Sequence, residues 1–506
     1  MKMKLFRLAA WAMAMTAAHL TAQTFTTLYN FPQVNSDDEN IYGAFPHPRP
    51  TLSGNTLYGT ALRGGLNGDG TVYKVNTNGT GMTRLHSFTG GNDGANPEDV
   101  LLLSGNTLYG TANNGGLYGS GTVFAVNSNG TGFTNLHSFT EPLGTNGGYG
   151  TNRDGAYPWA GLILSGNTLY GTANRGGLYG SGTLFAVNAD GTDFTNLHSF
   201  TAPLGIGGAD GTNYDGAFPI FGLLLSGTTL YGTANSGGTN GYGTVFALNA
   251  DGTGFTNLHS FTEPLGTEGG YGTNSDGAYP WGGLIQSGNT LYGTTPVGGS
   301  NGTGTVFAVN TDGTGFTTLY SFTSGSGSYS DTTNSDGAFP ICTLLLSGNT
   351  LYGEANSGGS SGNGTVFALS TNGTGFTNLH SFTTLGTEGG YETNSDGAFP
   401  WTGLILSGNS LYGTAKSGGL HGSGTVFSVT LPVPQLSITA SGTNVIMTWP
   451  TNAAGISFAG YTLQSTLNLG ATAAWNPVSP PPVVVNGQYF VTNPISGTQQ
   501  FYQLSQ

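Results

Sequence analysis

The sequence has little cysteine and little charge of either sign. Its single cysteine, Cys342, excludes a disulfide framework and a thiolate zinc site. Only 10 of the 506 residues are basic and 24 are acidic, so the formal net charge is -14. Because nucleic-acid affinity depends on lysine and arginine, we expect no nucleic-acid partner. Helical periodicity is missing after the N-terminal segment, which predicts an all-β chain.

The N-terminus has the layout of a secretory signal peptide. Basic residues precede an apolar run from Leu8 to Ala18, and small residues follow as far as Ala22. The alternative is a membrane anchor, but the run is too short to cross a bilayer as a helix. We therefore predict cleavage of residues 1–22, or after Ala18, and a mature chain without a membrane span, secreted or at the cell surface.

Glycine is abundant, with 90 residues, and the tripeptide Leu-Tyr-Gly recurs at spacings of 51, 61, 61, 61, 60 and 60 residues. One copy, from Gly161 to Phe200, contains four short β-branched or aromatic segments separated by Gly, Asn or Asp turns. Seven such copies predict a β-propeller or a straight β-solenoid. The tyrosines of the seven tripeptides are Tyr58, Tyr109, Tyr170, Tyr231, Tyr292, Tyr352 and Tyr412.

The two ends of the repeat favour the propeller. The last copy stops after its third segment, Thr425 to Val429, and the missing fourth segment stands at the mature N-terminus, Phe25 to Phe31. A closed ring needs this permutation, because the first strand then completes the last blade and removes the open edge. We predict a seven-bladed β-propeller over residues 24–430, closed by its N-terminal strand, and a small β-sandwich over residues 431–506.

The Leu-Tyr-Gly, Gly-Thr-Val-Phe and Leu-His-Ser-Phe series resembles the GloVer tandem repeat of secreted bacterial proteins. This resemblance covers residues 24 to 430 and implies export from a bacterium, with attachment through a choice-of-anchor C-terminus in many members. We recognise no sorting motif before Gln506. Trp449-Pro450, followed by a strand that opens at Tyr461, resembles the start of a fibronectin type III domain. The family implies no catalytic residues that could be transferred to this chain.

The long connections, after the second and fourth segments of each copy, are expected on one face of the propeller, which is the candidate binding surface. The residue after the proline that precedes each first segment varies between copies, and in three copies it is tryptophan. These tryptophans either stack on sugar rings or plug the channel entrance, and we favour the plug. The ligand-binding candidates on this face are Trp159, Trp281, Trp401, Tyr149, Tyr179 and Tyr271.

Two polar positions recur along the repeat. An aspartate before Gly-Ala either contributes to an acidic ring that binds calcium or caps its own Asp-Gly turn. Use in six copies favours the turn, so we expect no cofactor. The aspartates are Asp93, Asp154, Asp215, Asp276, Asp336 and Asp396. Five histidines share one position on the outermost segment, where we expect packing or hydrogen bonding: His86, His137, His198, His259 and His380.

A catalytic site is needed once, so it should break the symmetry of the repeat. The first two copies do so with His47, Arg49, Glu98 and Asp99, from which acid–base chemistry can be built. The alternative, which we favour, is that these residues vary without a function because they lie near the junction of the first and last copies. We therefore expect a monomeric, non-enzymatic binding or adhesion protein for an extracellular glycan or surface protein. The alternative is a glycoside hydrolase or polysaccharide lyase with its site at blades one and two.

Overall fold

The computed structural model describes residues 23–144, 150–204, 211–266, 272–326, 333–388, 391–453, 456–458, 460–467, 469, 473–495 and 500–505. Across these ranges the regular elements are β-strands and none is a helix, which confirms the all-β prediction. No helix able to cross a membrane is found in the described part of the chain. The chain forms two compact units, the repeat unit (Gln23–Leu431) and the C-terminal unit (Pro432–Gln506), and each is described by itself.

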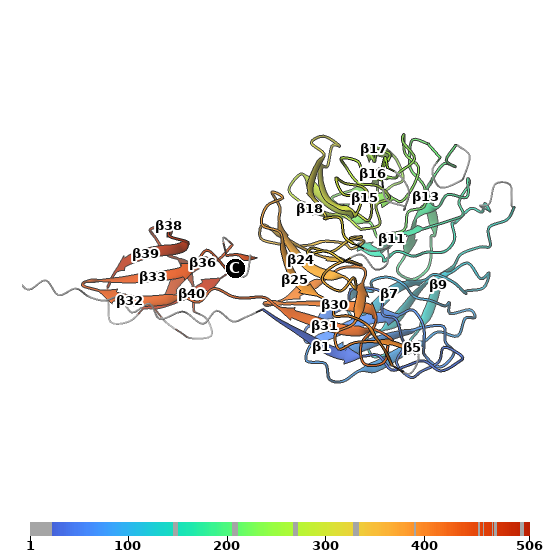
Figure 1. Ribbon diagram of the computed structural model, residues 1–506. Coiled ribbons are helices and arrows are strands. Elements are labelled where there is room, and N and C mark those ends of the chain that lie inside the picture. The colour runs from blue at the N-terminus through green and yellow to red at the C-terminus, as the bar shows by residue number, and fades with distance from the viewer. Residues whose placement is uncertain are drawn as a thin grey trace, which may run out of the picture. The chain divides into compact units, whose positions relative to one another are not determined.

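Six consecutive antiparallel sheets of the repeat unit each contain four strands in chain order (Figure 1). The first three comprise β2 (Thr51–Ser53), β3 (Thr56–Ala61), β4 (Thr71–Asn76) and β5 (Thr83–Ser87); β6 (Leu102–Ser104), β7 (Thr107–Ala112), β8 (Thr122–Asn127) and β9 (Thr134–Ser138); β10 (Ile163–Ser165), β11 (Thr168–Ala173), β12 (Thr183–Asn188) and β13 (Thr195–Ser199). The next three comprise β14 (Leu224–Ser226), β15 (Thr229–Ala234), β16 (Thr244–Asn249) and β17 (Thr256–Ser260); β18 (Ile285–Ser287), β19 (Thr290–Thr295), β20 (Thr305–Asn310) and β21 (Thr317–Ser321); β22 (Leu345–Ser347), β23 (Thr350–Ala355), β24 (Thr365–Ser370) and β25 (Thr377–Ser381).

The seventh sheet of the described repeat unit joins the two ends of the repeat. Strand β1 (Thr24–Asn30) pairs antiparallel with β31 (Thr425–Thr430), from Thr24 opposite Thr430 to Asn30 opposite Thr425. Figure 1 shows this pairing as a blue strand beside an orange one. The sheet continues through β30 (Ser410–Ser417) to β29 (Ile405–Ser407) and β28 (Ala398–Pro400). A separate hairpin precedes it, β26 (Gly386–Glu388) with β27 (Tyr391–Thr393).

The seventh and first sheets touch through the same contacts as internal neighbours do. The Phe45 N–H donates to the carbonyl of Ser423 at 2.8 Å, and the Tyr157 N–H donates to that of Ser120 at 2.8 Å. Likewise, the Thr414 hydroxyl donates to the Pro48 carbonyl at 3.0 Å. Its counterpart between the second and third sheets, from Thr111 to the Ala160 carbonyl, measures 2.9 Å.

The glycine of Leu-Tyr-Gly is required by the aromatic residue on the third strand. Gly171 lies opposite Phe185, and a Cβ on Gly171 would be 2.5 Å from the ring of Phe185. The ring of Phe185 therefore packs directly on the backbone of Gly171. This contact compensates for the side-chain packing that a glycine lacks within a strand. This explains why the two motifs recur together along the chain.

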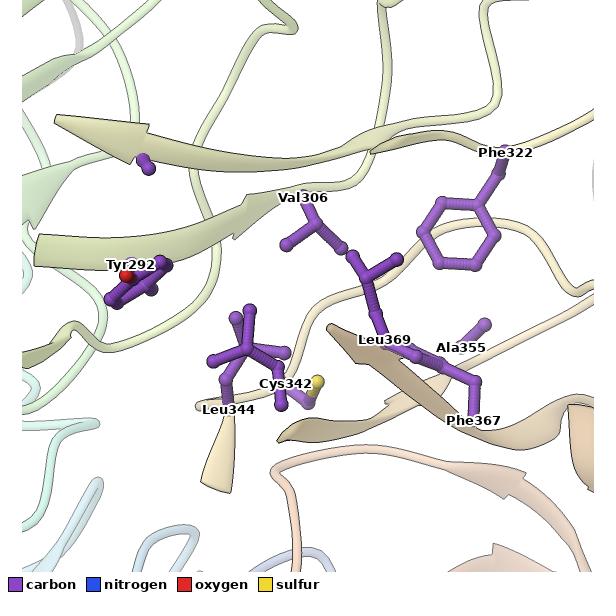
Figure 2. Packing of buried hydrophobic residues seen from close by; sticks show 10 residues of the cluster. Tyr292, Val306, Phe322, Cys342, Leu344, Ala355, Phe367 and Leu369 are labelled. Carbon is purple, nitrogen blue, oxygen red and sulfur yellow. The ribbon is translucent and has the colours of Figure 1, made fainter. Parts of the chain in front are cut away.

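The hydrophobic core of the repeat unit lies between neighbouring sheets. Figure 2 shows one interface, where Tyr292, Val306 and Phe322 of the fifth copy meet Cys342 and Leu344 of the sixth. All of these side chains are at least nine-tenths buried. Cys342 is thus a small buried core residue, and burial raises the pKa of its thiol to about 12.

The C-terminal unit is built from two main antiparallel sheets. One contains β32 (Ser437–Ser441), β33 (Asn444–Pro450), β39 (Gln488–Pro494) and β38 (Val483–Val485), and the other β37 (Asn476–Pro477), β36 (Thr462–Thr466) and β40 (Phe501–Ser505). A short hairpin, β34 (Asn452–Ala453) with β35 (Ile456–Ser457), is separate. Met447, Trp449, Leu463 and Val491 form the buried core between these strands.

Candidate functional site

The candidate site lies where the chain enters the first strands of the sheets. In each copy the entering residue follows a proline, and the residue before that proline has a left-handed backbone, as at Tyr157 (φ 56°) and Phe399 (φ 58°). Such a conformation is strained for a bulky residue and persists only where its surroundings fix it. Here it recurs in all seven copies, so it belongs to the scaffold that positions the entering residues.

Residues from six of the seven copies surround one pocket of about 260 Å³, named here the tryptophan pocket. It brings together two groups that the sequence analysis treated separately, the three tryptophans and part of the symmetry-breaking set. Its lining comprises His47, Leu62, Glu98, Asp99, Trp159, Ile220, Phe221, Trp281, Trp401, Thr402 and Lys416.

The aromatic wall of the pocket contains Trp159 and a contacting pair, Trp281 and Trp401, with ring centres 6.1 Å apart. Trp401 stacks on His47 with ring centres 5.1 Å apart, and the Lys416 ammonium lies 4.8 Å from the centre of the Trp401 ring. The indole nitrogens of Trp159 and Trp281 are buried, and no described residue accepts a hydrogen bond from either. The His47 Nε2 atom is buried without a partner in the same way. Buried polar atoms are seldom left unpaired, so these three are candidate ligand contacts.

The polar wall consists of Glu98 and Lys416. Burial raises the pKa of Glu98 to about 7, against the opposing effects of a weak hydrogen bond from Asn113 at 3.5 Å and of the Lys416 charge. Burial also lowers the pKa of Lys416, while Glu98 raises it. The two charged groups are not within ion-pair distance of each other among the described contacts. A ligand hydroxyl can therefore accept from Lys416 and donate to Glu98.

His47 and Asp99 are buried participants in the pocket wall. Burial, followed by the charge of Lys416, lowers the pKa of His47 to about 3, so its imidazole is neutral at ordinary pH. Burial raises the pKa of Asp99 to about 6. The two oxygens of Asp99 accept the backbone N–H groups of Val100 and Gly161. Asp99 therefore ties the second copy to the third, and each of its oxygens already accepts one backbone N–H group.

Arg49 does not join the other symmetry-breaking residues in the tryptophan pocket. Its side chain lines a second cavity of about 480 Å³, which shares only Asp99 and Phe221 with that pocket. The four residues of the first two copies are therefore divided between two cavities. Asp99 is the member that borders both.

Each recurring aspartate is held by residues at the end of the preceding copy. The Oδ2 atom of Asp154 lies 3.1 Å from Nε2 of His137, and the backbone N–H of Thr140 donates to the same oxygen at 3.0 Å. His137 also stacks on Phe194 of the next copy with ring centres 3.8 Å apart. Asp93, Asp215, Asp276 and Asp396 bond to histidines in the same way, and Asp336 accepts from Tyr320. Across the described chain, no three such groups are placed to hold a metal ion.

The tyrosine candidates lie away from the tryptophan pocket or outside the description. Tyr179 is 49% exposed in the loop after β11, and it is not part of the pocket lining. Tyr149 and Tyr271 lie outside the described residues.

The sequence analysis missed Lys416. Its position in the repeat is asparagine in four copies, at Asn113, Asn174, Asn235 and Asn356. A cation at a position that is usually a neutral amide is the signal that would have identified it. The symmetry-breaking residues predicted from the sequence lie in the first two copies, whereas Lys416 belongs to the seventh.

Comparison with known families matches the Gloeobacter/Verrucomicrobia repeat over residues 15–152, 209–333 and 271–472. This match confirms the resemblance based on Leu-Tyr-Gly and its companion motifs. The search of curated proteins found no match.

Several solved structures are similar at low sequence identity. An oligogalacturonate lyase in complex with manganese is 12% identical with a TM-score of 0.42, covering 81% of this chain and 96% of that one. The oligogalacturonate lyase of Vibrio parahaemolyticus is 11% identical with a TM-score of 0.42, covering 82% and 98%. A putative 6-phosphogluconolactonase of Bacteroides fragilis is 15% identical with a TM-score of 0.39, covering 67% and 85%. Such scores say nothing about what this chain binds.

Proposed function

The chain belongs to the Gloeobacter/Verrucomicrobia repeat family, and we propose that it is a secreted, non-enzymatic protein that binds a neutral sugar residue of an extracellular polysaccharide. The observation that carries this proposal is the tryptophan pocket. Trp159 and Trp281 present buried indole N–H groups that no described residue satisfies, beside the separated charges of Glu98 and Lys416.

A sugar matches both walls of this pocket. The C–H face of a pyranose stacks on indole rings, and its hydroxyl groups both donate and accept hydrogen bonds. The Trp159 and Trp281 N–H groups and Lys416 donate, whereas ionised Glu98 accepts. Glu98 and Lys416 are of opposite charge, and Asp99 already accepts two backbone N–H groups, so a neutral ligand adds no further charge to the pocket.

We also propose that the repeat unit is a seven-bladed β-propeller closed by strand β1. The pairing of β1 with β31 supports closure, because it supplies the fourth strand that the last copy lacks. The hydrogen bonds from Phe45 to Ser423 and from Thr414 to Pro48 support it further, since they repeat the internal contacts. In such a ring the first strands surround the axis, and the tryptophan pocket is the mouth of the central channel.

The remaining parts of the proposal concern export and attachment. Residues 1–22 have the composition of a signal peptide, which supports secretion from a bacterium. The two sheets of the C-terminal unit and its buried Trp449 support a fibronectin type III-like sandwich. We propose that this unit attaches or extends the propeller, with calcium not required.

The alternative is a glycoside hydrolase or polysaccharide lyase, and Glu98 is the observation that favours it. A carboxyl group with a pKa near 7 beside a desolvated lysine is typical of acid–base sites. Glycoside hydrolysis, however, commonly uses two carboxyl groups that flank the scissile bond. Asp99, the other carboxylate of the pocket, already accepts two backbone N–H groups. We therefore place binding before catalysis.

The test is a glycan-array screen of the mature chain, followed by titration of each binding glycan against variants. We expect W159A and W281A each to weaken binding at least tenfold while the thermal melt stays close to that of the wild type. The matched control is Y179A, which removes an exposed aromatic ring outside the pocket and should bind as the wild type does. Equal binding by W159A, W281A and Y179A would refute the proposal. Cleavage of a glycan that E98Q abolishes would establish the enzyme instead.

A further inference from the structure

The second cavity, of about 480 Å³, is distinct from the tryptophan pocket and has no part in the sugar proposal. Its size is that of a small-molecule site. First-strand residues of several copies line it, among them Leu164, Leu225 and Ile285, and most of these are aliphatic. Arg49 is the cation among its lining residues.

The cavity exists because most copies have a small residue where the first has Arg49. Arg49 stands three residues after Pro46. At the equivalent position the other six copies have Val100, Gly161, Gly222, Gly283, Thr343 and Gly403. Two of the glycines are required by close neighbours. A Cβ on Gly283 would lie 2.6 Å from the Thr343 hydroxyl, and a Cβ on Gly403 would lie 2.3 Å from the Thr343 carbonyl. The space left by these residues receives the one long side chain at this position.

The backbone of Arg49 is fixed from both sides. Pro48 and Pro50 flank it and restrict its backbone dihedrals. Its N–H donates to the Thr402 hydroxyl, which in turn donates to the His47 carbonyl at 3.1 Å. The side chain of Arg49 is therefore presented from a rigid segment, as a binding residue should be.

The guanidinium of Arg49 has no partner among the described residues. No described side chain or carbonyl accepts a hydrogen bond from it, and no described carboxylate lies within ion-pair distance. Asp99 is the charge that acts on it, but the oxygens of Asp99 accept hydrogen bonds from the backbone N–H groups of Val100 and Gly161 and none from Arg49. The five N–H donors of the partly buried Arg49 thus have no described protein acceptor in this mostly aliphatic cavity.

We propose that the second cavity binds a small monocarboxylate with an apolar body, whose carboxylate pairs with Arg49. A planar guanidinium matches a carboxylate through two parallel hydrogen bonds. Asp99 also lines the cavity, so a monocarboxylate that pairs with Arg49 is repelled less by this carboxylate than a dianion such as sulfate is. The aliphatic side chains receive the rest of the ligand.

The test uses benzoate as the probe and benzamide as its neutral counterpart of the same shape. Calorimetric titration of the mature chain should show benzoate binding at least tenfold more tightly than benzamide, with sulfate weaker than benzoate. R49M, which keeps the chain length without the charge, should lose this preference, and R49K should weaken benzoate binding several-fold. The matched control is R153M, which removes an exposed arginine outside both cavities and should bind benzoate normally.

The two proposals fail separately. R49M and R49K should keep their affinity for the glycan of the tryptophan pocket, and W159A should keep its affinity for benzoate. If R49M does not fold, as shown by its thermal melt, R49K decides the question. Equal affinity for benzoate and benzamide in the wild type, or unchanged benzoate binding in the folded arginine variants, would overturn the monocarboxylate site.

Discussion

Closure of the repeat by β1 can be tested with two phenylalanines in matching environments. Phe31 follows β1, and Phe88 follows β5 at the equivalent position of the first copy. Both side chains are 0% exposed. The Phe31 N–H donates to Gly424 at 3.0 Å, and the Phe88 N–H donates to Gly70 at 3.0 Å. Their rings contact Tyr73 and Phe124 at centre distances of 5.1 and 5.2 Å. The two sites differ in chain connection. Strand β1 is connected to the rest of the repeat unit only through its C-terminal end, whereas β5 is connected through both ends.

Replacing either phenylalanine by alanine removes a fully buried ring and leaves a cavity. Such a change costs roughly 3–5 kcal/mol of unfolding free energy. If β1 is an integral part of the seventh sheet, F31A and F88A should destabilise the repeat unit equally, within about 1 kcal/mol of each other. If β1 detaches easily, the cost of F31A cannot exceed the free energy of detaching it, because the strand separates before the rest unfolds.

The assay is guanidinium unfolding of the mature chain followed by circular dichroism, with both variants and the wild type measured together. We expect similar shifts of the midpoint and an unchanged slope for both variants. A loss of less than about 1 kcal/mol for F31A beside the full loss for F88A would refute integral closure. A small loss for F88A itself would refute the reasoning from burial.

Two further predictions concern separable parts of the chain. Removing residues 432–506 should leave the unfolding transition of the repeat unit in place, because each unit has its own core, and a melt lost together with the truncated segment would contradict this. Burial raises the pKa of Glu98 from 4.5 to about 7, so the stability linked to its neutral form is present below about pH 4.5 and lost as the pH rises towards 7. E98Q should therefore match the wild type in thermal melts near pH 4 and exceed it near pH 8, and equal melts at both values would disprove the shift.

The strands of the repeat could be predicted from the sequence because their signals are local. Alternating β-branched residues between Gly, Asn and Asp turns mark each strand, and the missing fourth strand after Thr425–Thr430 directed attention to the segment at Thr24–Asn30. The pairing of these two strands agrees with that expectation. The histidines were expected to pack or to form hydrogen bonds, but the bonds to aspartates, such as that of His137 to Asp154, were not foreseen. They join the end of one copy to the connection that follows it, and periodicity gives no information on such a contact.

The candidate site was harder to predict, because its side chains come from different copies. The tryptophans and the charged residues were separate hypotheses, and only a three-dimensional arrangement shows that Trp159, Glu98 and Lys416 line one pocket. The same arrangement separates Arg49 from Glu98, although their copies are adjacent in the sequence. Spacing along the chain gives the position of a residue within its copy, but not the direction or reach of its side chain.

Residues that depart from the repeat are informative here because the same strands and turns form in each of the seven copies. Where strand packing or a turn requires a particular residue, that residue recurs in every copy. A position that varies between copies is therefore one that packing and turn geometry do not fix. The ionisable departures that line the two cavities, at His47, Arg49, Glu98, Asp99 and Lys416, lie in the first, second and seventh copies, which are neighbours once β1 pairs with β31. The lining of the tryptophan pocket therefore combines polar groups from neighbouring copies with the rings of Trp159 and Trp281. That asymmetry is what a single sugar with one stacking face requires, and a ring of seven identical copies could not provide it.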